Sequence, residues 1–339
     1  MNAAFKYLFH KLIDSPERWY PILSVYYLTY RCRFRCPYCS DGSQRPYYSL
    51  PDEDPDPSTA LSILKEIRRH CDYIVITGGE PLEYPYLDEI LGGIEHLGFK
   101  EVVLTTNGYD VEKHLPSIAR SVDTLVFSLD TLNHRKADAW YGMGSGTLEK
   151  ILSNIAIAAA FAQKRYRITI SSVVTPDNIE DLYKVYQYTE RNGFTIAASP
   201  QLVGVKAHHS LLNNQAYTDF YDFLVREKKR GGNVYGTFKY LEYMRDLGKF
   251  ECRPFTMLVV SPSGSVYYPC LEVGQNGGNI LNNGSLHQLR SRGRKAFGPQ
   301  PSCDVRCHSA CALGFALILR YPFSIVEEAF HILRNTLRK

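Results

Sequence analysis

Short apolar runs of strand length alternate with longer amphipathic segments from Tyr20 to about Val203 of the 339-residue chain. The short runs are rich in Val, Ile, Tyr and Thr, which favour the pleated surface of a buried strand. We therefore expect strands at Ile22–Thr29, Tyr73–Thr77, Glu101–Thr106, Thr124–Leu129, Arg167–Val174 and Thr195–Ala198.

Between these runs, apolar residues recur three and four positions apart, which predicts helices with one buried face. Asp177 and Glu180 resemble a capping box at the start of the last helix. Strands that alternate with helices favour parallel strands joined by right-handed crossovers, so the expected fold class is α/β. The helical patterns cover Ala60–Ile67, Leu87–Ile94, Leu148–Ile155 and Ile179–Tyr186.

Helical and hairpin patterns flank this region. We expect residues 1–20 to form an amphipathic helix that packs on the rest of the protein through Phe5, Leu8, Phe9 and Leu12. Contact of this helix with a membrane surface is an alternative that we favour less. Residues 214–247 are helical in pattern, and two β-type runs around Ser261–Gly264 predict a hairpin.

Composition narrows the classes of function. Apolar residues make up 45% and charged residues 22%, which is ordinary for a globular protein. The net charge of +4 gives no reason to expect nucleic-acid binding. Arg and Lys are concentrated after Ser285, where we expect a solvated basic face, and a surface for an acidic partner or membrane headgroups is the alternative. The sequence shows no secretory signal and no apolar run long enough to span a bilayer, so we expect a cytoplasmic protein.

Nine cysteines are present, and eight of them fall into two groups, while Cys71 stands apart as an expected buried residue. An odd, clustered set favours metal ligation in a reducing compartment over a disulfide framework. Cys32, Cys36 and Cys39 have the spacing C-x3-C-x2-C directly after the first expected strand. Three such thiolates can bind three irons of a 4Fe–4S cluster and leave the fourth iron open. A zinc site completed by a distant ligand is the alternative.

This stretch, with Tyr38 before its last cysteine, resembles the cluster-binding motif of the radical SAM superfamily. The resemblance implies that the open iron binds S-adenosylmethionine (SAM). It also implies a partial (β/α)6 TIM-like barrel, in agreement with the alternating pattern. The implied reaction is reductive cleavage of SAM to a 5′-deoxyadenosyl radical, which abstracts hydrogen from a substrate C–H bond. An electron donor such as flavodoxin or ferredoxin is the implied partner.

Polar residues after the later strands resemble further motifs of the same family. One is its GGEP motif, which holds the amino group of SAM, and it is formed here by Gly78, Gly79, Glu80 and Pro81. The resemblance also implies cosubstrate contacts at the ends of three strands, namely at Asn107, Ser128, Asp130 and Ser171. Asn107 fits a turn before Gly108 equally well, and Asp130 fits a cap of the next segment equally well.

One position departs from the family pattern. Where relatives carry an arginine that pairs with the SAM carboxylate, this chain reads Trp140-Tyr141-Gly142. Either the Tyr141 hydroxyl or the guanidinium of Arg135 or Arg167 is expected to replace it. We expect the loop with His208 and His209, at the mouth of the barrel, to be solvated, and contact with substrate is the alternative.

The second group of cysteines surrounds and follows the expected hairpin, at Cys252, Cys270, Cys303, Cys307 and Cys311. We expect the hairpin to bring the first two together, and a helical conformation would place the last three on one face. The group resembles the twitch extension, or its longer relative SPASM, and implies one auxiliary 4Fe–4S cluster with one thiol to spare. The favoured ligands are Cys252, Cys270, Cys307 and either Cys303 or Cys311, and a structural zinc site is the alternative.

We therefore expect an N-terminal helix (1–20), a radical SAM core (21–230), a twitch- or SPASM-like extension (231–320) and a C-terminal amphipathic helix (321–339). Relatives with auxiliary clusters often oxidise the substrate radical. We expect dehydrogenation or cross-linking of a peptide or small molecule, with a catalytic base that the sequence does not identify. A redox-neutral epimerase, isomerase or decarboxylase is the alternative, and a non-catalytic iron–sulfur or zinc protein is a more distant one.

Overall fold

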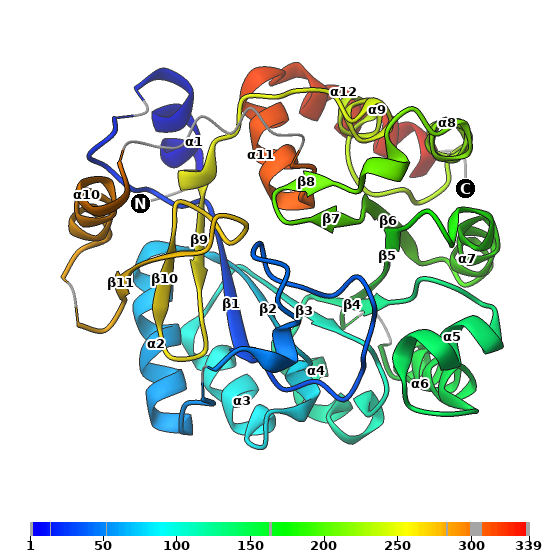
Figure 1. The fold of residues 1–339 in the computed structure, drawn as a ribbon, viewed down its shortest axis with the longest axis horizontal. Helices are drawn as coiled ribbons and strands as arrows, with labels where there is room; N and C mark the ends of the chain where they lie inside the picture. Colours follow the sequence, from blue (N-terminus) through cyan, green and yellow to red (C-terminus); the bar gives the residue numbers. More distant parts are fainter. Residues whose placement is uncertain are drawn as a thin grey trace. The chain divides into compact units, whose positions relative to one another are not determined.

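The computed structural model describes residues 3–336 except 14, 52, 163–164, 283 and 299–306. The chain forms two compact units, and it passes between them several times (Figure 1). Unit 1 comprises Met1–Ser128, His134–Ile168 and Pro254–Ser302. Unit 2 comprises Leu129–Asn133, Thr169–Arg253 and Cys303–Lys339. The domain limits expected from the sequence remain a prediction.

The first four predicted strands form the parallel sheet of unit 1. They are β1 (Leu23–Thr29), β2 (Tyr73–Gly78), β3 (Glu101–Thr106) and β4 (Thr124–Ser128), paired in this order. Ile74 of β2 is fully buried, as are alternate residues of its neighbours, because successive strand residues point to opposite faces. This arrangement, with helices between the strands, confirms the predicted α/β class.

Helices between these strands bury the positions that the periodicity indicated. In α2, Ile63, Leu64 and Ile67 are fully buried, and the Asp56 carboxylate caps the helix by accepting from two backbone amides of its first turn. The helices of this part of unit 1 are α2 (Pro57–His70), α3 (Leu87–Leu97), α4 (Leu115–Ser121), α5 (His134–Tyr141) and α6 (Thr147–Ala162).

Three later strands extend the same sheet beyond β1. β9 (Met257–Val260) pairs parallel to β1, and β10 (Ser265–Tyr268) and β11 (Gln275–Asn279) follow as antiparallel strands. The predicted hairpin is present, with Gly264 at φ +85° in its turn. β11 was not predicted, because its sequence QNGGN has no apolar alternation. α10 (Leu286–Phe297) packs beside β11.

α1 (Ala3–Leu12) contacts unit 1 through its polar side. The Lys6 ammonium donates to the Pro21 carbonyl at 2.8 Å, and His10 Nε2 lies 2.9 Å from the Tyr20 carbonyl oxygen. Phe9 is buried beside them, whereas the other apolar residues of the helix are exposed, namely Phe5, Leu8 and Leu12. The expected packing through all four apolar residues is therefore wrong for Leu8 and Leu12, because these polar contacts turn the helix the other way, whereas the part-exposed Phe5 ring lies edge to face against Tyr20, with centroids 6.1 Å apart.

Unit 2 contains two parallel strands, a short hairpin and helices. β5 (Arg167–Val174) pairs with β6 (Thr195–Pro200), and β7 (Leu202–Val203) pairs with β8 (Lys206–Ala207). The described helices are α7 (Ile179–Arg191), α8 (Gln215–Arg230), α9 (Phe238–Asp246), α11 (Ala310–Arg320) and α12 (Phe323–Thr336).

Two local predictions in unit 2 are corrected. α7 begins at Ile179, so the residue that precedes it is Asn178 and not Asp177. Asn178 is buried, and its side chain donates to the carbonyls of Asp130 and Val173 instead of capping the helix. Cys307 precedes α11, and only Cys311 lies in the helix, so these two thiols do not share a helical face.

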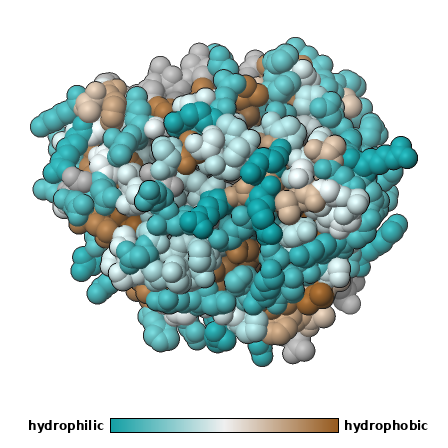
Figure 2. Space-filling model, turned by 60° about the horizontal axis from the view of Figure 1, so that its bottom comes forward, coloured by the Kyte–Doolittle hydropathy of each residue, from teal (hydrophilic) through white to brown (hydrophobic). Residues whose placement is uncertain are grey.

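Among the described residues, no single helix is long and apolar enough to span a membrane. The pair Ala310–Arg320 and Phe323–His331 satisfies the same length and composition criteria only together, and it is bent by 106°. The molecular face in Figure 2 carries mainly hydrophilic residues, with hydrophobic ones in small groups.

Two glycines in unit 1 provide a matched test of backbone packing. A Cβ on Gly79 would lie 2.3 Å from the Arg31 carbonyl oxygen, whereas one on Gly92 in α3 would meet nothing within 4 Å. We expect Gly79→Ala to lower the free energy of unfolding by about 2 kcal/mol or more, because backbone atoms must move. Gly92→Ala should raise it by up to about 1 kcal/mol. Urea unfolding measures both, and equal stability of the two variants would contradict the close approach.

Candidate active site

The first group of cysteines lies in the loop after the carboxyl end of β1. The Cys39 amide donates to the Cys36 carbonyl at 3.1 Å, so these two residues form a turn. Burial, reinforced by the carboxylates of Glu80 and Glu83, raises the pKa of the Cys32 thiol to about 12. The thiolate that iron requires would therefore form as the metal displaces the proton.

The loop after β2 contacts this cysteine loop backbone to backbone. The Gly79 amide donates to the Thr29 carbonyl at 2.7 Å, and the Glu80 amide donates to the Arg31 carbonyl at 2.7 Å. A Cβ on Gly78 would lie 2.1 Å from the Thr29 oxygen, in addition to the overlap at Gly79. The close approach of these two segments of the chain thus requires both glycines.

Glu80 is 2% exposed, and its carboxylate links the ends of β2 and β3. Its Oε1 accepts from the Leu82 amide at 3.0 Å and from Thr106 Oγ1 at 2.7 Å, and its Oε2 accepts from the Asn107 amide at 2.6 Å. A carboxylate has about four acceptor positions, so Oε2 retains capacity for one more donor. An ammonium group is the donor that such a carboxylate binds most strongly.

Burial raises the pKa of Glu80 to about 7, although the hydrogen bonds from Asn107, Thr106 and Leu82 favour the charged form. The carboxyl group is therefore close to its titration midpoint at neutral pH. A cation bound beside it would shift it to the charged form. Glu80 thus combines the burial, position and charge that recognition of an ammonium group needs.

Other predicted residues in unit 1 surround the two loops. Tyr38 contacts Trp140 edge to face, with ring centroids 5.6 Å apart. The buried Pro81 begins the short helix η2 (Pro81–Glu83). Asn107 Oδ1 accepts from the Tyr109 amide at 2.9 Å, so this side chain supports the turn while its own amide binds Glu80. Ser128 is half-buried at the end of β4.

The predicted residues of unit 2 have mainly backbone partners. Asp130 Oδ1 accepts from the Val173 amide at 2.6 Å, which fastens the segment 129–133 to β5. The buried Ser172 hydroxyl donates to the Leu129 carbonyl at 2.6 Å, and the adjacent Ser171 is half-buried. Contacts of Asp130 and Ser171 with a cosubstrate remain a prediction.

The structure shows where Arg167 and Arg135, the two arginines expected to bind the SAM carboxylate, are located. Arg167 pairs with Glu101 and donates to Thr124 Oγ1 at 3.0 Å, at the first residues of β3 and β4. These residues lie at the amino ends of the strands, whereas the motif loops follow the carboxyl ends. The expectation that Arg167 reaches the site is therefore wrong. Arg135 is exposed in the first turn of α5.

Arg35 contacts Tyr141 and Gly142, which lie where the sequence departs from the family pattern. Its role was not predicted from the sequence. Its amide donates to the Tyr141 carbonyl at 3.0 Å, and a Cβ on Gly142 would lie 3.3 Å from Arg35 Cβ. The guanidinium donates to the Cys32 carbonyl at 2.6 Å and covers the Tyr48 ring at 4.1 Å from its centroid. The available signal was its place inside the cysteine motif, one residue before Cys36.

A second missed feature is the ionic network around Asp110. Although burial opposes it, hydrogen bonds from Lys113, Arg33 and Lys150 hold the pKa of Asp110 below its usual range. Arg33 also pairs with Glu83 at 3.1 Å. The network connects the cysteine loop to the loops after β2 and β3. The charged residues beside each motif were the feature of the sequence that could have predicted it.

Within the described ranges, no three His, Cys, Asp or Glu side chains gather closely enough to hold one metal ion. The donors of the first group nevertheless fit a 4Fe–4S cluster, because each thiolate binds a different iron. Cys32, Cys36 and Cys39 lie on one loop, and Cys39 is close enough to Cys32 to add to the rise in the pKa of its thiol. The three residues would hold the cluster with Glu80 beside it.

The predicted auxiliary ligands belong to both units. Cys270 lies in unit 1, whereas Cys252, Cys307 and Cys311 lie in unit 2, and Cys303 is outside the described residues. The expected proximity of Cys252 and Cys270 and the auxiliary cluster remain predictions. Cys71, expected to be a buried residue, is 1% exposed.

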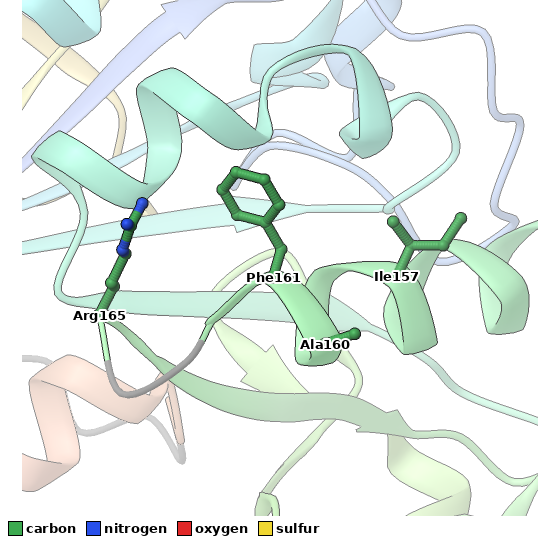
Figure 3. Close-up of a pocket in the computed structure, with 4 residues that line it drawn as sticks. All are labelled: Ile157, Ala160, Phe161 and Arg165. Carbon is green, nitrogen blue, oxygen red and sulfur yellow. The ribbon is translucent and has the colours of Figure 1, made fainter.

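A shallow hollow on the surface of α6 lies away from these loops. Figure 3 shows its lining, Ile157, Ala160, Phe161 and Arg165, at the carboxyl end of α6. This end of the helix leads into the start of β5, whereas the motif loops follow the carboxyl ends of the strands. The hollow is thus separate from the site.

Comparison with known proteins agrees with this geometry. The sequence profile of the radical SAM superfamily matches residues 26–189, which include the cysteine motif and the GGEP motif. A probable GTP 3′,8-cyclase of Methanosarcina acetivorans is 27% identical over 267 residues, covering 74% of this chain and 77% of that protein. A probable GTP 3′,8-cyclase of Methanosarcina mazei and the GTP 3′,8-cyclases of Limosilactobacillus fermentum and Synechocystis are 27–29% identical, and the matches cover 47%, 54% and 54% of their own lengths. The chain therefore carries a radical SAM domain over these residues.

Solved structures share the fold. SuiB of Streptococcus suis bound to SAM has a TM-score of 0.62 at 19% identity, covering 79% of this chain and 65% of that one. The enzyme anSMEcpe with bound SAM and a peptide also has a TM-score of 0.62, at 18% identity, covering 94% of this chain and all of that one. The predicted radical SAM fold is thereby confirmed.

The raised pKa of Glu80 generates a test of SAM recognition. Because only the charged carboxylate attracts an ammonium group, Glu80→Gln should weaken SAM binding by about 1.5–3 kcal/mol. In the parent, the contribution of the Glu80 carboxylate to the free energy of SAM binding should decline as pH falls through about 7. The SAM affinity of Glu80→Gln should not show this decline. Calorimetric titration at several pH values measures it, with the exposed Glu89→Gln as control. Unchanged affinity in Glu80→Gln would contradict the assignment.

Proposed function

We propose that Cys32, Cys36 and Cys39 bind a 4Fe–4S cluster at which SAM is reductively cleaved, and that hydrogen is then abstracted from a substrate C–H bond. The observation that carries the proposal is the buried Glu80 carboxylate, held by β3 and joined backbone to backbone to the cysteine loop. With cluster and SAM bound, one electron would convert SAM to methionine and a 5′-deoxyadenosyl radical. A flavodoxin or ferredoxin is the proposed electron donor.

The residues of unit 1 would divide the recognition of SAM. Glu80 would accept from the ammonium group through the remaining position of Oε2. Arg35 is our candidate for the carboxylate, because its guanidinium lies at the cysteine loop and the stem of its side chain lies beside Gly142. Tyr38 and Trp140 would shield the reacting atoms from water, which a primary radical site must exclude.

We further propose an oxidative outcome on a peptide or small molecule, with an auxiliary 4Fe–4S cluster as electron acceptor. Its support in unit 1 is the contact between the loop after Cys39 and the loop after Cys270. A Cβ on Gly42 would lie 1.7 Å from the Glu272 carbonyl oxygen, so these two backbones touch. Cys270 is therefore two residues before Glu272, whose backbone packs on the loop that follows Cys39.

A redox-neutral reaction is the second candidate, and the relatives named GTP 3′,8-cyclase favour it. In such a reaction the substrate radical would be converted without loss of an electron to a second cluster. GTP is therefore the first probe to incubate with reduced enzyme and SAM. Consumption of GTP to a product of unchanged mass would place this candidate first, and a product lighter by two hydrogens would favour the oxidative one.

The proposed auxiliary cluster is tested by Cys270→Ser, with Cys71→Ser as control for loss of a buried thiol. We expect Cys270→Ser to bind about half of the iron of the parent, because one of two 4Fe–4S clusters is lost. Formation of 5′-deoxyadenosine should persist in part, since it belongs to the first site. Iron analysis and product chromatography measure the two properties. Parental iron content in Cys270→Ser would remove the case for an auxiliary cluster bound through this residue.

A further inference from the structure

α1 and α10 meet in unit 1 through the segment that follows α1. The Tyr20 ring packs edge to face on Phe9 of α1, at 4.8 Å, and on His287 of α10, at 4.9 Å. The Trp19 amide donates to His287 Nδ1 at 3.0 Å. In Figure 1, α1 lies at the upper left and α10 at the left, beside β11. The α1–α10 surface is defined by the exposed residues Phe5, Leu8, Leu12, Ile13, Arg294, Lys295 and Phe297.

The outward side of α1 carries bulky apolar side chains and the exposed Lys11, whereas Lys6 and His10 face inward. Leu8 is 51% exposed, Leu12 75% and Ile13 66%. Phe5, Leu8 and Leu12 are three and four positions apart, so they form one stripe along the helix. Lys6 and His10 bind backbone carbonyls on the inner side, so the helix cannot bury the stripe by rotating without losing these contacts.

The neighbouring helix contributes positive charge. Arg294 and Lys295 are exposed in the last turn of α10, next to the exposed Phe297. Neither α1 nor α10 contains Asp or Glu, and the acids of the connecting segment are Asp14 and Glu17. The two neighbouring helices thus carry bulky apolar side chains on α1 and cations in the last turn of α10.

We propose that the α1–α10 surface docks on an anionic lipid membrane. An amphipathic helix in a membrane interface buries Phe, Leu and Ile at the acyl boundary, while nearby Lys and Arg bind acidic headgroups. A protein partner of comparable area would also bury the stripe, but the paired apolar and basic character matches a negatively charged interface. The docking is peripheral, and it is independent of the function proposed for the cysteine site.

Vesicle co-flotation of the full chain tests the proposal, with vesicles of phosphatidylcholine alone or mixed equally with phosphatidylglycerol. We expect binding to the mixed vesicles, weaker binding to the neutral ones, and release by salt. Leu8→Glu/Leu12→Glu should weaken binding at least about tenfold, because each carboxylate faces the acyl chains. Ile157→Glu is the matched control, since Ile157 is an exposed apolar residue on α6 (Figure 3).

A charge variant gives a second, milder test. Lys295→Glu should weaken binding to the mixed vesicles several-fold and flatten its salt dependence, whereas Lys65→Glu on α2 should not. Thermal unfolding shows whether each variant is folded. Absence of parental binding to the mixed vesicles, or parental binding by a folded Leu8→Glu/Leu12→Glu, would overturn the proposal. A concentration-dependent dimer of the parent that this double variant abolishes, without vesicle binding, would assign the surface to a second copy instead.

Discussion

The close backbone contact between the segment after β1 and the segment after β2 is the constraint on which the site depends. Two hydrogen bonds of 2.7 Å join Thr29 and Arg31 to Gly79 and Glu80, and the segments are so close that neither Gly78 nor Gly79 has room for a Cβ. The contact fixes Glu80 beside Cys32, and the Glu80 carboxylate in turn holds the end of β3. Parallel strands bring their carboxyl ends to one edge, and the glycines turn this proximity into a defined arrangement.

The sequence predicted the parallel core well, because the apolar period of a buried strand is a local property. Each strand from β1 to β4 lies within one residue of its expected limits. The motifs that carry chemistry were also local, since each of them follows one strand. Predictions failed where a distant partner decides the outcome. Lys6 and His10 turn α1 by bonds to the carbonyls of Pro21 and Tyr20, which no periodicity reveals.

Pairing between distant segments explains the other features that the sequence did not show. β9 extends the core sheet by pairing with β1, more than 200 residues earlier in the chain. Arg35 was overlooked because its role depends on Tyr141 and Gly142, which reach it only in the fold. Arg167 was expected to reach the site because its strand belongs to the barrel pattern. In the structure its side chain lies at the amino end of the strands, paired with Glu101.

The central claim is that one loop of three cysteines and the buried Glu80 together form a SAM-cleaving site. It is tested most directly by formation of 5′-deoxyadenosine from SAM in anaerobically reconstituted, chemically reduced protein, measured for the parent and for Cys36→Ser. The account predicts that the parent forms 5′-deoxyadenosine and that the folded variant forms none. An iron-loaded parent that binds SAM without cleaving it, or a variant as active as the parent, would contradict the account.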